Sequence, residues 1–289
     1  TVDRFENILV TQVLSLGMER RKDWVYRALV ELLREDGEQV DAIYERNDVT
    51  IRTLEGLEQG KGFYQMEGLK TDLSGHVTIT ENRIKYDVDY MEGQKTGFFL
   101  DQKYNRQAAA KLARGRRVLD CFTHTGAFAL NAAAAGAEHV TAVDVSAFAL
   151  ELAAENGKRN GLTNLDYKCA DVFDLLTEMA KEKKCDYDYI ILDPPAFTKS
   201  RATAKNAYHG YKEINRKAMR LLPRGGYLAT CSCSHFMTDE MFRKMLQEAA
   251  LDAGVTLRQI EARQQAPDHP ILPEVPETDY LKFYLLQVV

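Results

Sequence analysis

Apolar and polar positions along the chain follow two different periods, and in the first third they predict a mixture of helices and strands. Apolar residues recur at helical spacing in 8–16 and 24–33, which predicts two helices. A short apolar run at 40–44 predicts a strand. Residues 77–90 alternate apolar and polar positions on both sides of a polar turn, which predicts a hairpin. We therefore expect residues 1–92 to form a small α+β domain.

The remaining residues, 93–289, alternate short apolar runs with amphipathic segments. This alternation predicts a mostly parallel sheet covered by helices on both faces. Ser146 is a suitable N-cap for one helix, and Gly161 is a suitable residue to end it. The last two runs have no helical segment between them, so we expect one of these strands to be antiparallel. The expected strands are 117–121, 139–144, 165–169, 187–193, 226–232, 255–262 and 280–288, and the expected helices are 105–114, 126–135, 146–160, 172–183, 208–222 and 239–253.

Charge and cysteine content exclude several classes of protein. The net charge of -5 excludes a globally basic nucleic-acid binder, so any RNA contact must come from a local patch of Lys and Arg. The five cysteines form no CxxC pair and no zinc-ligand spacing, which favours a reducing cytoplasm and predicts no metal. No apolar run approaches the roughly 20 residues of a membrane span, so we expect no membrane association.

Acidic residues follow four of the predicted strands. Asp144 lies 24 residues after Asp120, which is the approximate spacing at which an acid after a second strand binds ribose hydroxyls. Asp171 and Asp193 follow the next two strands. The turn after Asp120 holds one glycine, Gly126, so the dinucleotide fingerprint G-x-G-x-x-G is missing and a nicotinamide dehydrogenase is disfavoured. Singly, each acid is equally well explained as a helix cap.

Four strand-end acids with one glycine resemble the class I S-adenosylmethionine-dependent methyltransferases, which have a Rossmann-like seven-stranded sheet. In such a site we expect Asp144 to accept hydrogen bonds from ribose hydroxyls and Asp171 from an adenine amino group. Gly126 would then lie against the methionine part of the cofactor, because a glycine allows close approach of the backbone.

The loop after the fourth strand begins Asp193-Pro194-Pro195 and continues to Phe197. Two successive proline rings stiffen this loop, and a stiff loop can hold a target base beside a methyl donor. By itself this motif indicates methylation of an exocyclic amino group. Phe197 is expected either to stack on a flipped base or to pack against Pro195. The alternative for the whole motif is a stiff turn.

Two cysteines, Cys231 and Cys233, stand at the end of the fifth strand of this alternating series. Carbon 5 of cytosine is a poor nucleophile, but a thiolate that adds to carbon 6 makes carbon 5 enamine-like, which is covalent catalysis in its general form. This chemistry needs a partly exposed cysteine of lowered pKa. We expect Cys231 to be buried within the strand and Cys233 to face the crevice. The alternative is that both are small core residues.

Five motifs in a fixed order resemble one family of enzymes. They read Q-K-T-G-F-F-L-D-Q-K-Y-N-R at 94–106, D-C-F-T-H-T-G-A-F at 120–128, L-D-P-P-A-F at 192–197, S-C-S-H-F-M at 232–237 and A-P-D-H-P at 266–270. Together they resemble the RlmI-type 23S ribosomal RNA cytosine-5 methyltransferases over nearly the whole chain.

The resemblance implies roles for individual residues. It implies that Cys233 is the catalytic nucleophile and that Asp193 acts on the edge of the cytosine ring. The implied cofactor-binding residues are Gln94, Lys95, Thr96, Asp120, Phe122, Thr125, Gly126, Asp144, Val145, Asp171, Val172 and Asp193. The expected substrate-binding residues are Pro194, Pro195, Phe197, Lys199, Arg201 and His235.

The resemblance also implies partners. We expect S-adenosyl-L-methionine as cofactor and RNA, specifically 23S ribosomal RNA, as substrate of a cytoplasmic enzyme, and we allow for a homodimer. The family usually begins with an RNA-binding PUA domain, and we see none before Asp3. Two alternatives stay open: a base-nitrogen RNA methyltransferase that uses the Asp193 motif, and a non-catalytic RNA-binding or ribosome-assembly module.

Overall fold

The computed structural model describes residues 1–182, 185–198 and 204–289. The chain divides into two compact units, Thr1–Leu100 and Asp101–Val289, whereas the sequence places the domain boundary after residue 92. Among the described residues, no helix combines the length and the apolar character that crossing a membrane requires.

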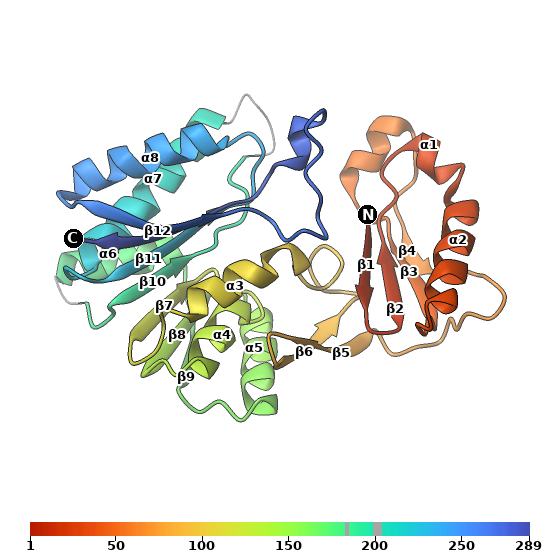
Figure 1. The fold of residues 1–289 in the computed structure, drawn as a ribbon, viewed down its shortest axis with the longest axis horizontal. Helices are drawn as coiled ribbons and strands as arrows, with labels where there is room; N and C mark the ends of the chain where they lie inside the picture. Colours follow the sequence, from red (N-terminus) through yellow and green to blue (C-terminus); the bar gives the residue numbers. More distant parts are fainter. Residues whose placement is uncertain (183–184, 199–203) are drawn as a thin grey trace. The chain divides into compact units, whose positions relative to one another are not determined.

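The first unit is built on a four-stranded sheet in the order β1-β2-β3-β4 (Figure 1). The two central strands are parallel, and each outer strand is antiparallel to its neighbour. A helix between β2 and β3 supplies the crossover that a parallel pair needs. Its buried residues pack with apolar residues of these strands in one core. The elements are β1 (Val2–Phe5), β2 (Ile8–Thr11), α1 (Leu16–Glu19), α2 (Lys22–Glu35), β3 (Ala42–Arg46), the 3-10 helix η1 (Thr50–Glu55) and β4 (Lys61–Phe63).

The helix expected at 8–16 is wrong, because β2 occupies the start of this segment. All four residues of β2 are buried. A strand that is covered on both faces reads as a continuous apolar run, and such a run also satisfies helical spacing over a short window. The helix expected at 24–33 is confirmed as α2, and the strand expected at 40–44 is confirmed as β3, which begins and ends two residues later.

The expected hairpin is confirmed as β5 (His76–Glu81) and β6 (Ile84–Asp89), which form an antiparallel two-stranded sheet. The two residues between them, Asn82 and Arg83, both have positive φ, at 52° and 68°. Positive φ at both central positions is the mark of a type I′ turn, whose twist matches that of the flanking strands.

The second unit contains a seven-stranded sheet in the order β12-β13-β11-β10-β7-β8-β9. Every strand pair is parallel except those that involve β13, which runs antiparallel to β11 and to β12. The seven-stranded α/β fold and its single antiparallel strand are therefore confirmed. The strands are β7 (Arg117–Cys121), β8 (His139–Asp144), β9 (Leu165–Cys169), β10 (Tyr189–Leu192), β11 (Tyr227–Ser232), β12 (Leu257–Arg263) and β13 (Lys282–Val288).

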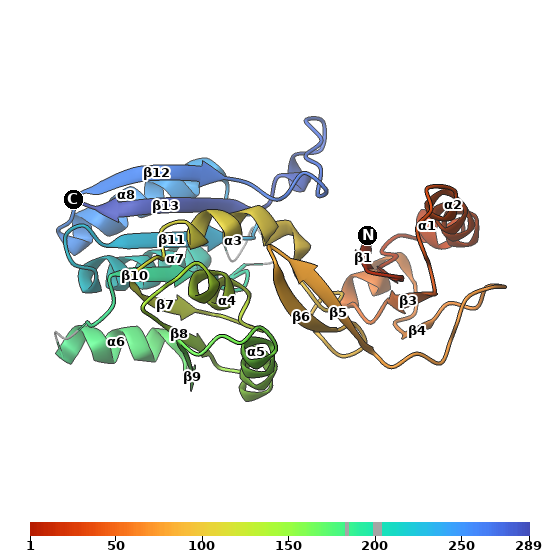
Figure 2. The ribbon, with the colours of Figure 1, turned by 60° about the horizontal axis from the view of Figure 1, so that its bottom comes forward.

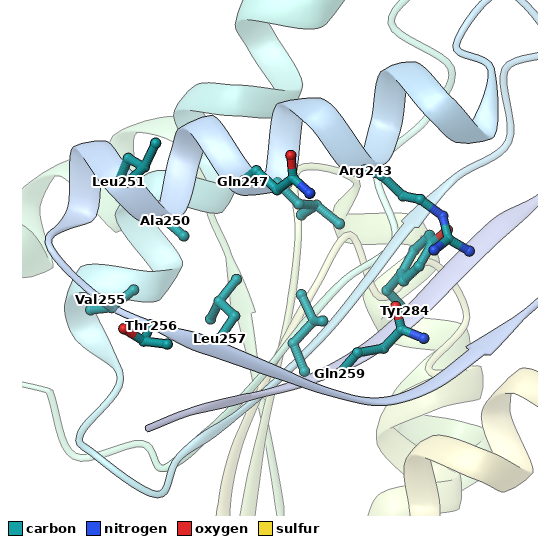
Figure 3. A pocket seen from close by; sticks show the side chains of 11 residues that line it. Arg243, Gln247, Ala250, Leu251, Val255, Thr256, Leu257, Gln259 and Tyr284 are labelled. Carbon is teal, nitrogen blue, oxygen red and sulfur yellow. The ribbon is translucent and has the colours of Figure 1, made fainter.

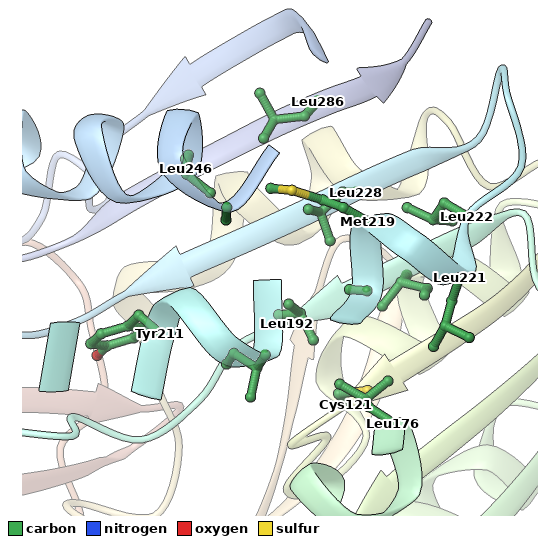
Figure 4. Close-up of a cluster of buried hydrophobic side chains, with 14 of the residues drawn as sticks. Cys121, Leu176, Leu192, Tyr211, Met219, Leu221, Leu222, Leu228, Leu246 and Leu286 are labelled. Atoms are coloured by element: carbon green, nitrogen blue, oxygen red, sulfur yellow. The ribbon is translucent and has the colours of Figure 1, made fainter. Parts of the chain in front are cut away.

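Helices cover both faces of this sheet, as Figures 1 and 2 show. On one face α6, α7 and α8 pack on the strands through the cluster in Figure 4. On the other face the small side chains of α3 and α4 pack against the middle strands. The helices are α3 (Lys103–Ala110), α4 (Ala127–Ala134), α5 (Ala147–Arg159), α6 (Val172–Glu182), α7 (Ala204–Leu221) and α8 (Asp239–Ala253), with 3-10 helices η2 (Leu100–Gln102) and η4 (Pro276–Thr278).

The strand order fixes where a ligand can bind in this unit. The chain goes from β7 outward through β8 to β9, and then returns to the other side of β7 to form β10 and β11. The order therefore reverses between β7 and β10. In open α/β sheets, ligands bind beyond the carboxyl ends of the strands at such a switch point.

Candidate functional site

The carboxyl ends of the parallel strands bring most of the predicted residues of the second unit to one edge of the sheet. Asp120 lies near the end of β7, Asp144 ends β8, Asp193 follows β10 and Cys233 follows β11. The charges of Asp144 and Asp193 both act on Asp120, and Asp193 acts on Cys233. The structure therefore gathers these four side chains into one electrostatically coupled group.

The turn after β7 has an unusual backbone. Phe122, His124 and Gly126 all have positive φ, at 63°, 51° and 84°. Left-handed conformations cost free energy for residues with a side chain, and they concentrate at functional sites. Thr125 is buried within the same turn. Gly126 is the N-cap of α4, so the turn leads directly into a helix whose first N–H groups lack intrahelical partners.

Asp120 holds this turn in place. Its side chain is fully buried, and its Oδ2 accepts hydrogen bonds from the Thr123 hydroxyl at 2.6 Å and from the Ala129 N–H at 2.9 Å. Burial, followed by the charges of Asp193 and Asp144, raises the pKa of Asp120 to about 7, although the bonds from Thr123 and Ala129 oppose the shift. We infer that Asp120 shapes the turn, and its direct contact with a cofactor stays a prediction.

Asp144 and Asp171 differ in their environments. Asp144 is half-buried, and it accepts hydrogen bonds from the N–H groups of His124 and Ser146, both at 2.9 Å. It therefore joins the turn after β7 to the start of α5, where Ser146 is confirmed as N-cap. Asp171 is exposed and accepts from the N–H groups at the start of α6, including that of Phe173 at 2.8 Å. Asp171 thus caps α6, and its contact with an adenine amino group stays a prediction.

Asp193 lies at the switch point beside β7. Its Oδ1 accepts a hydrogen bond from Gln102 Nε2 at 3.0 Å. Burial raises the pKa of Asp193 to about 6; the positive charge of Arg106 opposes this shift and the charge of Asp101 adds to it. A carboxyl group with a pKa this close to neutrality can hold or release a proton under physiological conditions.

The two cysteines differ in burial, as their positions in the strand predict. Cys231 is fully buried in β11, and Cys233, just past the end of the strand, is partly exposed. The thiol of Cys233 nevertheless differs from the expectation of a lowered pKa. Burial, with the charges of Asp193 and Asp101, raises the pKa of Cys233 to about 12.

Comparisons with known proteins identify the family. A model of the S-adenosylmethionine-dependent methyltransferase family matches residues 63–287. The chain is 45% identical over 290 residues to the ribosomal RNA large subunit methyltransferase I of Photobacterium profundum, covering 100% of this chain and 70% of that protein. The chain belongs to the ribosomal RNA large subunit methyltransferase I family. Its relative of the same name in Aeromonas hydrophila is 45% identical over 285 residues, covering 98% of this chain and 69% of that protein.

A solved structure confirms the fold of this methyltransferase. A putative S-adenosylmethionine-dependent methyltransferase from Streptococcus mutans matches with a TM-score of 0.83 and 23% identity. The match covers 100% of this chain and 71% of that one. The predicted family resemblance, the enzyme class and the cofactor S-adenosylmethionine are confirmed by these relationships, and a nicotinamide dehydrogenase is excluded.

The residues at the switch point fit a positively charged ligand. Asp101 and Asp120 each have a buried oxygen, Oδ1, without a hydrogen-bond partner among the described residues. S-adenosylmethionine carries an ammonium group and a sulfonium centre, and a nearby cation favours the ionised form of a carboxyl group. Burial destabilises the ionised forms of Asp120 and Asp193 in the protein without a ligand, and the positive charge of the cofactor would stabilise them.

This electrostatic fit predicts how cofactor binding depends on pH. The pKa values of Asp120 and Asp193 are raised, so both groups gain protons as the pH falls towards 6. Because the cation favours ionised carboxylates, affinity for S-adenosylmethionine should rise by about tenfold from pH 5.5 to 7.5. Isothermal titration calorimetry measures this. S-adenosylhomocysteine, which lacks the sulfonium charge, is the matched control ligand, and its affinity should change less with pH. An equal change of affinity with pH for both ligands would contradict the account.

Several residues of the site were missed by sequence reasoning. Asp101, Gln102 and Arg106 are buried polar residues at the start of the second unit, and their charges or hydrogen bonds act on Asp193. Lys282, a buried lysine at the start of β13, interacts with Cys233. The signal for the first group was present, because the junction motif at 94–106 has too many polar and special residues for a passive linker.

Three residues of the junction motif at 94–106 are expected to bind the cofactor, and they lie in the first unit. Thr96 is fully buried and donates a hydrogen bond from its hydroxyl to Asp3 Oδ2 at 2.5 Å. Lys95, whose φ is 56°, forms an ion pair with Asp3 at 3.4 Å. Gln94 is exposed. Their role in binding the cofactor stays a prediction.

The predicted substrate-binding residues are only partly described. Phe197 packs against Tyr211 and Phe173, with ring centroids 4.6 and 5.7 Å apart, so its ring already has partners within the protein. Pro194 is buried and Pro195 is exposed. Lys199 and Arg201 lie outside the described residues.

The other predicted positions at this edge are surface residues or parts of the core. His235 is exposed, and its ring lies 3.8 Å from that of Phe236. Val145 is 72% exposed, whereas Val172 is buried. Among the described residues no group of His, Cys, Asp and Glu is arranged to hold a metal ion.

A separate cavity of about 540 Å³ lies between α8 and the edge of the sheet (Figure 3). Its lining comes from α8, from β12 and β13, and from the segment that precedes β12. None of the predicted site residues lines it. The cavity therefore plays no part in the site at the carboxyl ends of the strands.

Proposed function

We propose that this methyltransferase forms 5-methylcytosine in large-subunit ribosomal RNA, with Cys233 as the covalent nucleophile and Asp193 as the acid that acts on the cytosine ring. The observation that carries the proposal is the position of Cys233. It is partly exposed at the end of β11 and coupled to Asp193 at the end of the neighbouring strand β10. Relatives with 45% identity are named for ribosomal RNA of the large subunit.

The proposed chemistry assigns a task to each of the two side chains. The Cys233 thiolate forms a bond to carbon 6, and the electron pair of the C5–C6 double bond moves so that carbon 5 becomes nucleophilic. Asp193, whose pKa is about 6, supplies or shares a proton at the polar edge of the ring. S-adenosylmethionine supplies an electrophilic methyl group. Water or a carboxylate of the site then takes the proton from carbon 5, and the electron pair of that bond restores the double bond and expels the thiolate of Cys233. Asp193 regains its proton from the ring, and S-adenosylhomocysteine leaves as the second product.

A second candidate is methylation of a base nitrogen, and one observation favours it. The pKa of Cys233 is raised to about 12, which leaves very little thiolate at neutral pH. A base-nitrogen methyltransferase needs only the stiff Asp193-Pro194 loop and no nucleophilic thiol. The identity of the methylated nucleoside separates the two candidates.

The test is to incubate the enzyme with a large-subunit ribosomal RNA transcript and S-adenosylmethionine, and then to digest the RNA to nucleosides for mass spectrometry. The proposal expects 5-methylcytidine. Appearance of an N-methylated nucleoside without 5-methylcytidine would replace the proposal with the second candidate. A transcript in which the modified cytidine is changed to uridine serves as control and should stay unmethylated.

We further propose that the first unit contacts the RNA through the start of α2. Trp24 is 73% exposed there, although tryptophan side chains are usually well buried. Arg27 lies one helical turn from Trp24, and Arg20 precedes the helix; both are exposed, and neither forms a salt bridge among the described residues. An exposed aromatic ring on a helix that carries an exposed arginine one turn away suits stacking on an unpaired base and contact with phosphates.

Trp24 is the only tryptophan of the chain, so its fluorescence reports this contact directly. Titration with a single-stranded RNA of about 16 nucleotides should quench the emission, because a base stacks on the indole ring. Heparin, which has negative charge but no bases, should leave the emission nearly unchanged. Trp24→Phe removes the signal, and Trp24→Ala should weaken RNA binding by about 1–3 kcal/mol. Leu32→Ala, at a 60% exposed position of the same helix, is the matched control. RNA binding without quenching would contradict the contact.

The state of the cysteines supports a proposal about the compartment. All five cysteines are free thiols, and free thiols persist in a reducing environment. We propose that the enzyme works in the cytoplasm.

A further inference from the structure

One buried charge next to the proposed nucleophile has no role in the site described above. Lys282 is 3% exposed and begins β13, where it pairs across the sheet with Ser232 of β11. Its Nζ donates hydrogen bonds to the carbonyl oxygens of Ser234 at 2.6 Å and Tyr280 at 2.8 Å. Ser234 directly follows Cys233, so the lysine holds the segment that carries the thiol.

The buried ammonium group forms no ion pair with any carboxylate among the described residues. Burial lowers the pKa of Lys282 to about 8, although the charges of Asp279, Cys233 and Asp239 act in the opposite direction. Burying an unpaired cation destabilises a protein. Two carbonyl contacts could be made by a neutral side chain, so loop anchoring alone does not explain a lysine at this position.

The charged groups around Cys233 are nearly all of the wrong sign for a nucleophile. Burial is the largest cause that raises the pKa of its thiol, and the charges of Asp193 and Asp101 raise it further. The charge of Lys282 lowers it. The other titratable neighbours, Cys231 and Tyr211, are neutral at physiological pH because burial raises the pKa of each. Lys282 is thus a cation that opposes the effect of these two carboxylates on Cys233.

We propose that Lys282 is a positioning residue that holds the Cys233 segment and supplies the positive charge that stabilises its thiolate. The importance of this for catalysis rests on the proposed function, in which Cys233 is the nucleophile. When a bound nucleotide covers Cys233 and excludes water, the attraction between the ammonium and the thiolate strengthens, because the local dielectric constant falls.

The test is the pH dependence of alkylation at Cys233, which requires neither RNA nor methyl donor. The thiol loses its proton to the buffer, the thiolate attacks iodoacetamide and iodide leaves; peptide mass spectrometry gives the rate at each cysteine. Lys282→Gln keeps a hydrogen-bond donor but removes the charge, and Lys282→Arg keeps the charge. We expect the Gln variant to be alkylated about tenfold more slowly at pH 7.5, which corresponds to one unit in the pKa of Cys233. The Arg variant should match or exceed the wild type.

Controls separate this effect from loss of structure. Alkylation of the exposed Cys169 should be the same in every variant, and thermal unfolding checks that each variant is folded. The wild type alone gives a second readout. Its Cys233 rate should flatten above pH 8, where Lys282 loses its charge, before it rises again.

Two results would overturn the proposal. One is a Gln variant whose Cys233 profile coincides with that of the wild type, and the other is a wild-type rate that rises tenfold per pH unit throughout. A different result would refute the proposed function alone. The alkylation rate of Cys233 would then still depend on Lys282, but the Cys233→Ala variant would retain methylation activity.

Discussion

Replacing Cys233 with alanine should reduce methyl transfer to RNA by at least about a thousandfold, with little change in S-adenosylmethionine affinity. The thiol is the only group in the site that we assign to the bond with carbon 6, and its loss leaves carbon 5 too weakly nucleophilic to react. Its side chain is partly exposed, and alanine introduces no larger atom there. Transfer of a radioactive methyl group to RNA measures the activity, and calorimetry measures cofactor binding.

The matched control is Cys169→Ala. Cys169 is an exposed free cysteine at the end of β9, so its replacement tests whether any loss of a thiol affects the enzyme. It should keep full activity. Retention of full activity by Cys233→Ala would refute covalent catalysis and leave base-nitrogen methylation as the better account.

Replacing Gly126 with alanine should destabilise the protein by about 2–4 kcal/mol and weaken S-adenosylmethionine binding by tenfold or more. A Cβ atom at Gly126 would lie 2.5 Å from Leu130 Cδ1 and 3.0 Å from the Cβ of Ala153, and φ is 84°. Leu130 can move, but Ala153 is part of α5 and fully buried. The added methyl group would therefore push α4 away from α5 and distort the turn held by Asp120.

Gly161→Ala is the matched control, because it has the same backbone requirement without the crowding. Its φ is 65°, and no atom lies within 4 Å of the added Cβ. Its free energy of unfolding should fall by only about 1 kcal/mol, and it should bind the cofactor normally. Thermal and chemical unfolding give the free energies, and calorimetry gives the affinity. Equal losses in both variants would show that backbone strain, and not packing of the turn, sets the effect.

Most of the fold of the second unit was predictable because its elements satisfy local rules. Strand β8 coincides with the expected range, and α5 begins after the predicted cap Ser146. The absence of a helix between the last two strands predicted that one of them is antiparallel, and the structure shows that it is β13. In contrast, the sequence of β2 predicts a helix, because burial of the strand on both faces removes the alternation that marks a strand.

The candidate site was predictable in position but not in electrostatics. Sequence order places Asp120, Asp193 and Cys233 after strands, and parallel strands bring those ends together. The raised pKa of Cys233 depends on burial and on Asp101, which comes from a different part of the chain. Lys282 is likewise brought beside Cys233 only by the pairing of β13 with β11. Long-range packing of this kind leaves no pattern in the local sequence.

The central claim is that the Cys233 sulfur bonds to carbon 6 of a cytosine, and trapping that bond tests it most directly. RNA that contains 5-fluorocytosine cannot lose a proton from carbon 5, so the enzyme should remain attached after methyl transfer. Denaturing electrophoresis would then show an enzyme–RNA complex that depends on S-adenosylmethionine, and mass spectrometry would place the nucleotide on the peptide that holds Cys233. Normal methylation of unmodified RNA with no such complex, or attachment at another residue, would contradict the account.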